Sequence, residues 1–180
     1  MIIVMGLPGA GKSTVLSAAT KSDYKTVNYG DLMFEIAKKT AGITDRDSIR
    51  KLDWTVQKKV QAEVGHALSE MSGKIILDTH CSIATPKGYL PGLPYSLLSQ
   101  LKIDGFVLIT APVEEINARR QNDITRIRDE ESLESLAEHD EMNRALLATY
   151  ACLAGAPACI ILNKNGKLNE AQEKFLSLLK

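Results

Sequence analysis

Short apolar runs alternate with amphipathic stretches along the chain. The runs are rich in β-branched residues and predict five buried strands, at residues 1–5, 25–29, 75–78, 106–110 and 158–162. Between the runs, apolar residues recur every three or four positions, which is the spacing of a helix with one buried face. Strands that alternate with helices predict an α/β fold, in which a parallel β-sheet of about five strands is flanked by helices on both faces.

Capping and helix-breaking residues indicate where these helices begin and end. Asp53 is the expected cap of the helix whose apolar stripe comprises Val56, Val60, Val64, Leu68 and Met71. Other helices are predicted over about 13–21, from Leu32, from a start at 44–47, from Pro112, over 132–154 and up to Leu179. Proline and glycine crowd the segment 85–94, which predicts a loop without regular structure, and the polar segment 121–131 predicts a mobile loop.

The composition limits the classes of function. A chain of 180 residues is expected to form one domain. Its 22 basic and 22 acidic side chains balance, so no broad field favours nucleic acid or an anionic membrane surface. Its three cysteines show no metal-binding spacing and predict buried thiols in a reducing cytoplasm. Gly155 and Pro157 break the uncharged segment 145–162, which we interpret as a helix end, a turn and a strand and not as a membrane span.

A glycine-rich loop follows the first strand. Residues 6–13 match the pattern G-x-x-x-x-G-K-[ST] of a phosphate-binding loop (P-loop), between a predicted strand and a predicted helix. In this motif the lysine, here Lys12, reaches the β- and γ-phosphates, and the hydroxyl group of Ser13 binds Mg²⁺. The pattern predicts that a nucleoside triphosphate such as ATP binds to Gly6, Leu7, Pro8, Gly9, Ala10, Gly11, Lys12, Ser13 and Thr14.

Two polar residues follow the third strand. Asp78 ends an apolar run, where an acid is costly unless it has a partner, and we expect it to hold Mg²⁺ directly or through water. A helix-capping aspartate is the alternative. His80 either has a catalytic role or only orders the loop.

Arginines gather around one polar loop in a chain without net charge. The loop is flanked by Arg119, Arg120, Arg126 and Arg128. Guanidinium groups bind phosphate oxygens and neutralise a phosphoryl group during its transfer, so we expect these side chains to be catalytic. A solvated helix end paired with Asp123 and Asp129 is the alternative.

Two further segments are candidates for a second substrate. Arg46 and Arg50 lie between two short helices, where they either bind a second phosphate or stabilise a helix surface. The segment 85–94 combines rigid prolines with glycines and suits a pocket for a base or ribose, with a plain long loop as the alternative.

The motifs recur together in one order. They lie in the segments 6–14, 27–35, 45–52, 78–80, 85–94 and 125–129. The P-loop alone is generic, and the specific part is the stretch Thr85-Pro86-Lys87-Gly88-Tyr89-Leu90 with Gly92-Leu93-Pro94, followed by Thr125-Arg126 and Arg128-Asp129. From end to end, the chain resembles the archaeal-type adenylate kinases, which are P-loop nucleoside monophosphate kinases.

The resemblance implies reversible transfer of the γ-phosphoryl group of ATP to AMP, giving two ADP, with Mg²⁺. It implies one domain with a core (1–29, 73–120 and 132–180), a helical monophosphate-binding segment (about 30–72) and a short lid (about 121–131), both of which close to exclude water. Substrate contacts are expected at Asp31, Arg46, Arg50, His80, Lys87, Gly88 and Tyr89. The resemblance also implies a cytoplasmic enzyme that is often a homotrimer.

The chain departs from bacterial and eukaryotic relatives in its short lid and in Phe34, where an arginine is common. The residues alone leave the base of the acceptor open, so a kinase for CMP or UMP is the nearest alternative. A GTP-dependent switch or binding module is the other alternative, because Asn163-Lys164-Asn165-Gly166 resembles a guanine-reading motif, although it lacks the final aspartate.

Overall fold

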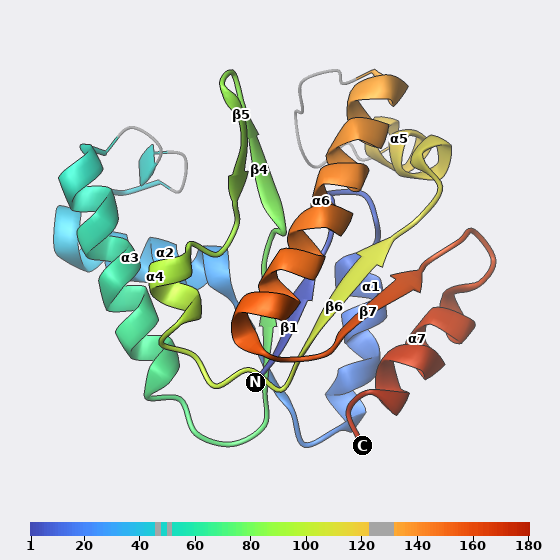
Figure 1. Ribbon diagram of the computed structural model, residues 1–180, viewed down its shortest axis with the longest axis horizontal. Helices are drawn as coiled ribbons and strands as arrows, with labels where there is room; N and C mark the ends of the chain where they lie inside the picture. The colour runs from blue at the N-terminus through green and yellow to red at the C-terminus, as the bar shows by residue number, and fades with distance from the viewer. Residues whose placement is uncertain (46–47, 50–51, 123–131) are drawn as a thin grey trace.

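The computed structural model describes residues 1–45, 48–49, 52–122 and 132–180 (Figure 1). Its centre is a sheet of five parallel strands in the order β2-β3-β1-β6-β7, which confirms the predicted α/β fold. The strands are β1 (Ile2–Met5), β2 (Lys25–Asn28), β3 (Ile75–Asp78), β6 (Gly105–Thr110) and β7 (Ala158–Leu162). All five predicted strands are present, with β1 at the middle of the sheet.

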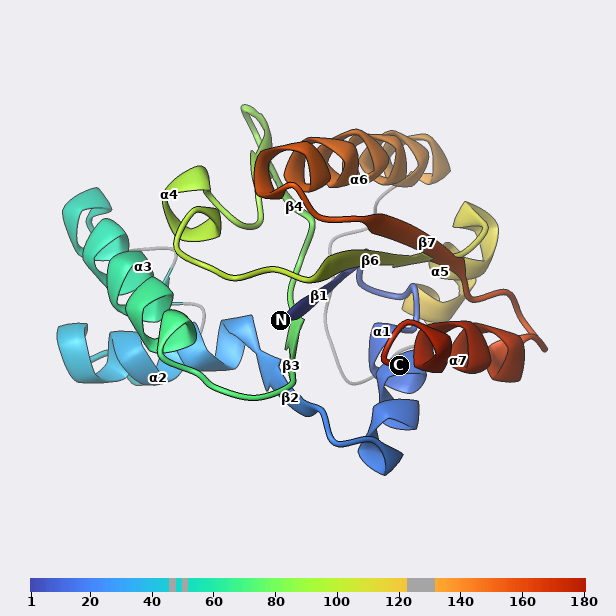
Figure 2. The ribbon, with the colours of Figure 1, turned by 60° about the horizontal axis from the view of Figure 1, so that its bottom comes forward.

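Alternate residues of each strand point to opposite faces of the sheet, and each face has its own core. In β1, Ile3 and Met5 pack on the face covered by α2 (Tyr29–Ala41), α3 (Trp54–Ser69), α4 (Tyr95–Leu98) and α6 (Leu133–Ala154). Ile2 and Val4 pack on the face covered by α1 (Lys12–Leu16), the 3₁₀ helix η1 (Ser17–Lys21) and α7 (Leu168–Ser177). Figure 2 shows α4 and α6 on one side of the sheet and α1 and α7 on the other. Burial on both faces explains why the strands are continuous apolar runs.

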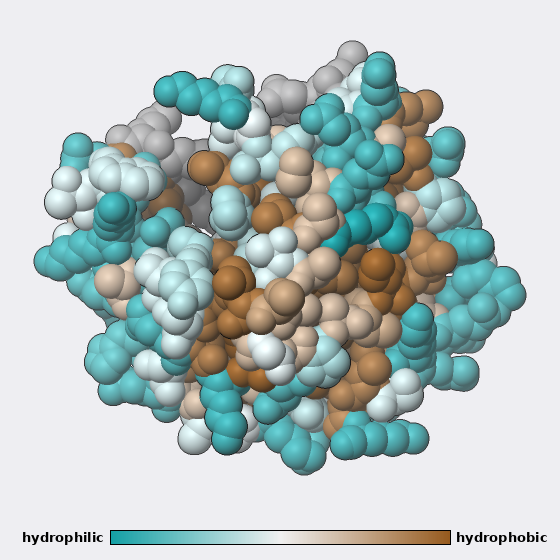
Figure 3. Space-filling model, viewed as in Figure 1, coloured by the Kyte–Doolittle hydropathy of each residue, from teal (hydrophilic) through white to brown (hydrophobic). Residues whose placement is uncertain are grey.

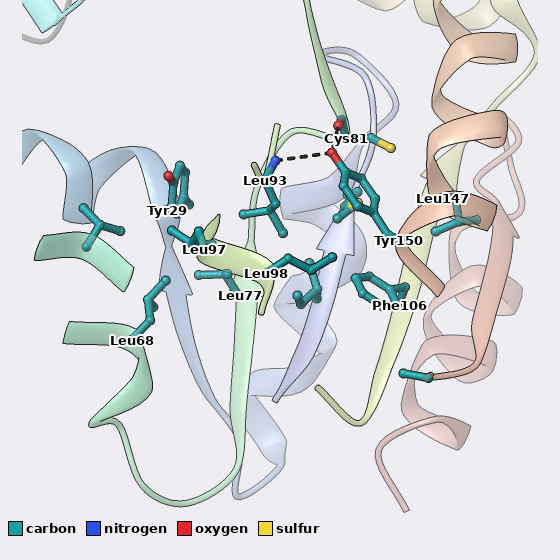
Figure 4. Close-up of a cluster of buried hydrophobic side chains, with 14 of the residues drawn as sticks. Tyr29, Leu68, Leu77, Cys81, Leu93, Leu97, Leu98, Phe106, Leu147 and Tyr150 are labelled. Carbon is teal, nitrogen blue, oxygen red and sulfur yellow. Dashed lines mark hydrogen bonds between the residues drawn. The ribbon is translucent and has the colours of Figure 1, made fainter. Parts of the chain in front are cut away.

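The larger core contains a hydrogen-bonded tyrosine (Figure 4). Phe106 of β6 stacks on Tyr150 of α6, with 6.0 Å between the ring centroids. The Tyr150 hydroxyl donates to the carbonyl of Cys81 at 2.8 Å and accepts from the N–H of Leu93 at 3.3 Å. Burial raises the pKa of Tyr150 to about 12, so the hydroxyl stays protonated and can donate. These hydrogen bonds attach the chain on either side of residues 82–91 to α6.

The prediction of an irregular loop over 85–94 is wrong. Residues 82–91 form an antiparallel hairpin of β4 (Ser82–Thr85) and β5 (Gly88–Pro91), which stands at the carboxyl edge of the main sheet (Figure 1). The prolines lie where strand hydrogen bonds are not needed, because Pro86 is in the turn and Pro91 ends β5. The Thr85 hydroxyl also donates to the carbonyl of Gly88 at 2.7 Å, which closes the turn.

Several predicted helix boundaries are confirmed. Asp53 accepts the N–H of Thr55 at 2.8 Å at the start of α3, and Ser132 accepts that of Ser135 at 3.1 Å at the start of α6. Helix α5 (Val113–Gln121) follows Pro112. The single helix predicted over 13–21 is instead α1 followed by η1. The predicted helix start at 44–47 and the lid at 121–131 lie partly outside the described residues.

The uncharged segment 145–162 comprises the end of α6, a turn at Gly155 and β7, as predicted. In the described ranges, no helix combines the length and the apolar character that crossing a membrane requires. The prediction of buried thiols holds for Cys81 only, because Cys152 is exposed on α6 and Cys159 is partly exposed on β7. Burial raises the pKa of the Cys81 thiol to about 12, so it is neutral and unreactive.

Candidate active site

The carboxyl ends of the strands carry the polar residues of the site. The P-loop follows β1, Asn28 ends β2, Asp78 ends β3, Thr110 ends β6 and Asn163 follows β7. In parallel sheets, ligands bind in the crevice outside this edge. The topology therefore gathers groups that are far apart in the sequence.

The P-loop lies against neighbouring groups on both of its flanks. A Cβ atom at Gly6 would lie 2.2 Å from the carbonyl oxygen of Ile109 in β6, so only glycine fits there. Gly11 has a φ of 81°, and a Cβ atom there would lie 2.3 Å from Nδ2 of Asn163. Both ends of the loop therefore require glycine, for space and for backbone conformation.

Two side chains from distant segments fasten the P-loop. Arg120 at the end of α5 donates its Nε–H to the carbonyl of Pro8 at 2.7 Å. Asn163 donates from Nδ2 to the carbonyl of Ala10 at 2.9 Å. These bonds satisfy the loop carbonyls and fix its conformation before a ligand binds. Among the residues that the structure describes, no side chain caps the start of α1, which leaves its first N–H groups for an anion.

Lys12 and Asp78 form an ion pair beside this loop. The distance from Lys12 Nζ to Asp78 Oδ1 is 3.4 Å, and the two side chains are only 13% and 14% exposed. Asp78 Oδ2 accepts a hydrogen bond from Asn28 Nδ2 at 3.0 Å. Asp78 Oδ1 is buried and accepts no hydrogen bond from the described residues. Because a buried acceptor without a donor is costly, this oxygen is poised for a further partner.

The oxygen atoms near Lys12 fit Mg²⁺. This ion is usually held by one or two protein oxygens together with substrate phosphates and water. Asp78 Oδ1 is one such oxygen, and the exposed hydroxyl group of Ser13 in α1 is a second candidate. Across the ranges that the structure describes, no three His, Cys, Asp or Glu side chains form a metal-binding cluster. The donor set thus fits an ion that arrives with a nucleotide.

A pocket of about 210 Å³ opens beside Gly11 and Thr14, and its wall includes Arg119 and residues 163–166. Arg119 Nη2 donates to Glu115 Oε2 at 2.9 Å, to the Asn163 carbonyl at 2.9 Å and to Asn165 Oδ1 at 2.6 Å. Its Nη1 is buried and has no hydrogen-bond partner among the described residues. The planar guanidinium group of Arg119 lines the pocket and keeps one donor nitrogen without a partner among the described residues. Such a group is suited to contact a flat, polar ring.

Glu115 organises this pocket, although no sequence motif marks it as a site residue. Its Oε2 accepts from Arg119 and, at 2.6 Å, from the backbone N–H of Asn165. The spacing of four residues between Glu115 and Arg119 on α5 was the only sequence signal for this pair. The contacts of Glu115 and Asn163 with distant backbone had no sequence signal, because they depend on the packing of α5 against the segment after β7.

The predicted substrate residues lie on several elements at the carboxyl edge of the sheet. They are nearer to β2 and β3 than to the pocket beside Gly11. Asp31 is in the first turn of α2, His80 lies between β3 and β4, and Lys87 and Gly88 are at the hairpin tip, all exposed. Tyr89 packs on His139 of α6, with 4.8 Å between the ring centroids. The remaining predicted residues lie outside the described ranges, and their roles stay predictions: Arg46, Arg50, Arg126 and Arg128.

Comparisons with known proteins were made for the whole chain. Residues 5–137 match the family model of the AAA domain. The chain is 45% identical to the adenylate kinase of Methanothermobacter thermautotrophicus, over 99% of this chain and 98% of that protein. It is 43% identical to the adenylate kinase of Thermoplasma acidophilum, over 98% of this chain and 97% of that protein.

Among solved structures, shikimate kinase from Acinetobacter baumannii in complex with shikimate is similar, with a TM-score of 0.62. The two chains are 20% identical, and the match covers 99% of this chain and 92% of the other. At this identity the similarity shows a shared fold and nothing about the substrate.

Proposed function

The chain belongs to the adenylate kinase family, and from this premise we propose how its residues transfer the γ-phosphoryl group of ATP to AMP. The resemblance inferred from the sequence is thereby confirmed, as is the function of a phosphotransferase that interconverts ATP and AMP with two ADP. The observation that carries the proposal for the site is the largely buried pair of Lys12 and Asp78 beside the P-loop.

ATP binds with its phosphates in the P-loop, where Lys12 pairs with the β- and γ-phosphates. Its base enters the pocket beside Gly11, against the guanidinium group of Arg119. Mg²⁺ bound with ATP neutralises phosphate charge, and the residues that would hold it are Asp78 and Ser13. Arg120 contributes by holding the Pro8 carbonyl, so its expected catalytic role includes keeping the P-loop in shape.

AMP binds on the side formed by α2, α3 and the hairpin, near Asp31, His80 and residues 87–89. Its phosphate has a second pKa near ~6, so the attacking oxygen is anionic at neutral pH and needs no general base. The chemistry then requires positive charge around the transferred group and exclusion of water. Arg126 and Arg128 would supply that charge, because Arg119 is proposed to lie against the base of ATP, and Arg46 or Arg50 would hold the AMP phosphate.

We expect the segment about 30–72 and the lid about 121–131 to move inward over the bound pair, while the core remains fixed. Hydrogen exchange with and without a bisubstrate analogue tests this movement. Equal protection of both segments in the two states would contradict it.

We also propose that the chain assembles as a cytoplasmic homo-oligomer, and specifically a trimer. Ile83 and Leu90 lie directly opposite each other in the hairpin and are 45% and 57% exposed. Apolar side chains also gather over the lower end of α6 and beside it on the face shown in Figure 3. Size-exclusion chromatography with light scattering would measure the molecular mass of the protein in solution. A monomer at all concentrations would refute the assembly.

The test of the nucleotide assignment offers Mg·ATP with AMP, CMP, UMP, GMP or no acceptor, and separates the products by chromatography. We expect the fastest turnover with AMP, with two ADP formed for each AMP consumed. Fastest turnover with CMP or UMP would assign another monophosphate kinase. Fastest turnover without an acceptor would exclude a kinase.

A further inference from the structure

The side chain of Asn28 forms hydrogen bonds with two groups. One is the carboxylate of Asp78 at the end of β3, and the other is the backbone of the first turn of α2. Asn28 is the last residue of β2 and lies directly opposite Asp78, the last residue of β3, in the parallel register. Its Nδ2 donates to Asp78 Oδ2 at 3.0 Å, and its Oδ1 accepts the N–H of Asp31 at 3.0 Å. One side chain therefore holds a carboxylate and caps a helix at the same time.

The two partners of Asn28 fix the orientation of its amide group. The N–H of Asp31 is a donor, so it must face the amide oxygen. The carboxylate oxygen of Asp78 is an acceptor, so it must face the amide nitrogen. Rotating the amide by 180° would set donor against donor and acceptor against acceptor, which makes the observed orientation strongly preferred.

The bond from Asn28 also decides which oxygen of Asp78 faces the P-loop. The terminal torsion of an aspartate side chain is broad, so the carboxylate rotates freely unless it is held. With Oδ2 held by Asn28, Oδ1 remains on the side of Lys12, at 3.4 Å from Nζ and without a hydrogen bond from the described residues. Asn28 thus aims Oδ1 at the place where phosphates and Mg²⁺ are proposed to bind.

We propose that Asn28 is a positioning residue that holds Asp78 in the orientation needed for Mg·ATP and couples that orientation to the start of α2. This inference rests on the proposed function of the P-loop and of Asp78. Carboxylates that bind metals are commonly oriented by a hydrogen bond from a second residue, and loss of that residue typically weakens metal binding or activity by about 10–100-fold. Because α2 begins the monophosphate-binding segment, the same side chain connects the two substrate sides, and the coupling acts in both directions.

Two substitutions separate the two hydrogen bonds. Asn28→Ser keeps a good helix cap, but its hydroxyl group is too short to cap α2 and also reach Asp78. Asn28→Ala removes both bonds. The matched control is Asp53→Ala, which removes the cap of α3 and does not touch Asp78.

We expect Asn28→Ser to raise the Mg²⁺ concentration for half-maximal rate by about 10-fold or more. Its thermal midpoint should stay close to that of the unmodified protein. Asn28→Ala should show the same Mg²⁺ shift together with a midpoint lowered by about 2–4 °C. Asp53→Ala should lower the midpoint similarly and leave the Mg²⁺ dependence unchanged.

Two measurements without turnover complete the test. Calorimetry gives the affinity for ATP with and without Mg²⁺, and we expect the gain from Mg²⁺ to be at least about tenfold smaller in Asn28→Ser. Hydrogen exchange of the first turn of α2 should slow when Mg·ATP binds to the unmodified protein and should not slow in Asn28→Ser.

The results distinguish this inference from the proposed function. An unmodified protein that shows no AMP-dependent consumption of ATP would refute the proposed function itself. If the unmodified protein passes that assay but Asn28→Ser keeps its Mg²⁺ dependence, or if Asp53→Ala shifts it equally, Asn28 is only a helix cap and the inference is wrong.

Discussion

The donor side and the acceptor side of the site are built in different ways. The proposed donor side comprises the P-loop, Arg119, Arg120 and residues 163–166, and its candidate ligand-binding groups are mostly backbone N–H groups on one short segment. The acceptor side comprises α2, α3 and the hairpin of residues 82–91, and its candidate side chains come from separate elements. The P-loop at the centre of the donor side is therefore encoded locally, whereas its supports and the acceptor side depend on how distant segments pack.

The supports of the two sides differ as well. Asn163 and Arg120 hold the carbonyl groups of the P-loop itself. The hairpin is held at its base, where the Ser82 hydroxyl donates to Asn143 Oδ1 at 2.6 Å and lies 3.0 Å from His139 Nε2. Since the single Ser82 proton goes to Asn143, Nε2 of His139 is the donor in the second bond. The tip of the hairpin extends from this base and is exposed.

The largest expected effect comes from removing the charge at the centre of the donor side. Lys12→Ala should lower kcat by about 10²–10³-fold, because an ammonium group that stabilises the transferred phosphoryl group is lost. The fold should persist, since Lys12 is not part of either apolar core. Steady-state kinetics and circular dichroism measure the two effects. The exposed Lys21→Ala in η1 is the control, and an active Lys12→Ala would refute the role of Lys12.

The next effect tests the base of the hairpin on the acceptor side. Ser82→Ala leaves Asn143 Oδ1 and His139 Nε2 without their shared partner in a buried site, which should lower the free energy of unfolding by about 2–3 kcal/mol. The KM for AMP should rise, and the KM for ATP should not. Urea unfolding and kinetics measure these changes, with the exposed Ser96→Ala as the control. An equal rise in both KM values would mean that the hairpin does not belong to the acceptor side alone.

Much of the donor side could be predicted from the sequence, because the P-loop motif specifies a local backbone conformation between a strand and a helix. The five strands, the cap at Asp53 and the helix start near Ser132 were predictable for the same reason. The hairpin was missed because Pro86, Gly88 and Pro91 break local patterns, yet lie in the turn or at the end of a strand. The contacts that Asn28, Glu115 and Asn163 make with distant segments were missed because these partners are about 50 or more residues away, as for Asn28 with Asp78.

A smaller effect is expected from the support of the P-loop. Asn163→Ala leaves the Ala10 carbonyl without its donor and should lower the free energy of unfolding by about 1–2 kcal/mol. The expected loss is smaller than at the hairpin base, because one buried group loses its partner here and two lose it there. The KM for ATP should rise while the KM for AMP stays constant, which is the reverse of Ser82→Ala. Asn169→Ala, on the exposed side of α7, should change neither KM.

The smallest expected effect is a pH dependence of stability that arises from a helix cap on the acceptor side. The hydrogen bond from the N–H of Thr55 is the main cause that lowers the pKa of Asp53, the cap of α3. Because the pKa of Asp53 is lower in the folded than in the unfolded chain, its contribution to stability is complete above about pH 4 and is lost as the pH falls through the folded value.

Asp53→Asn keeps a capping oxygen but cannot titrate, so it isolates this contribution. The difference in midpoint between the unmodified protein and Asp53→Asn should be constant from about pH 5 to 7 and should shrink toward acid pH. Thermal unfolding at each pH measures it. The P-loop is held by an amide and a guanidinium group, neither of which titrates in this range, so Asn163→Ala should cost the same stability throughout. A constant difference for Asp53→Asn down to about pH 2 would show that the charge of Asp53 does not stabilise α3.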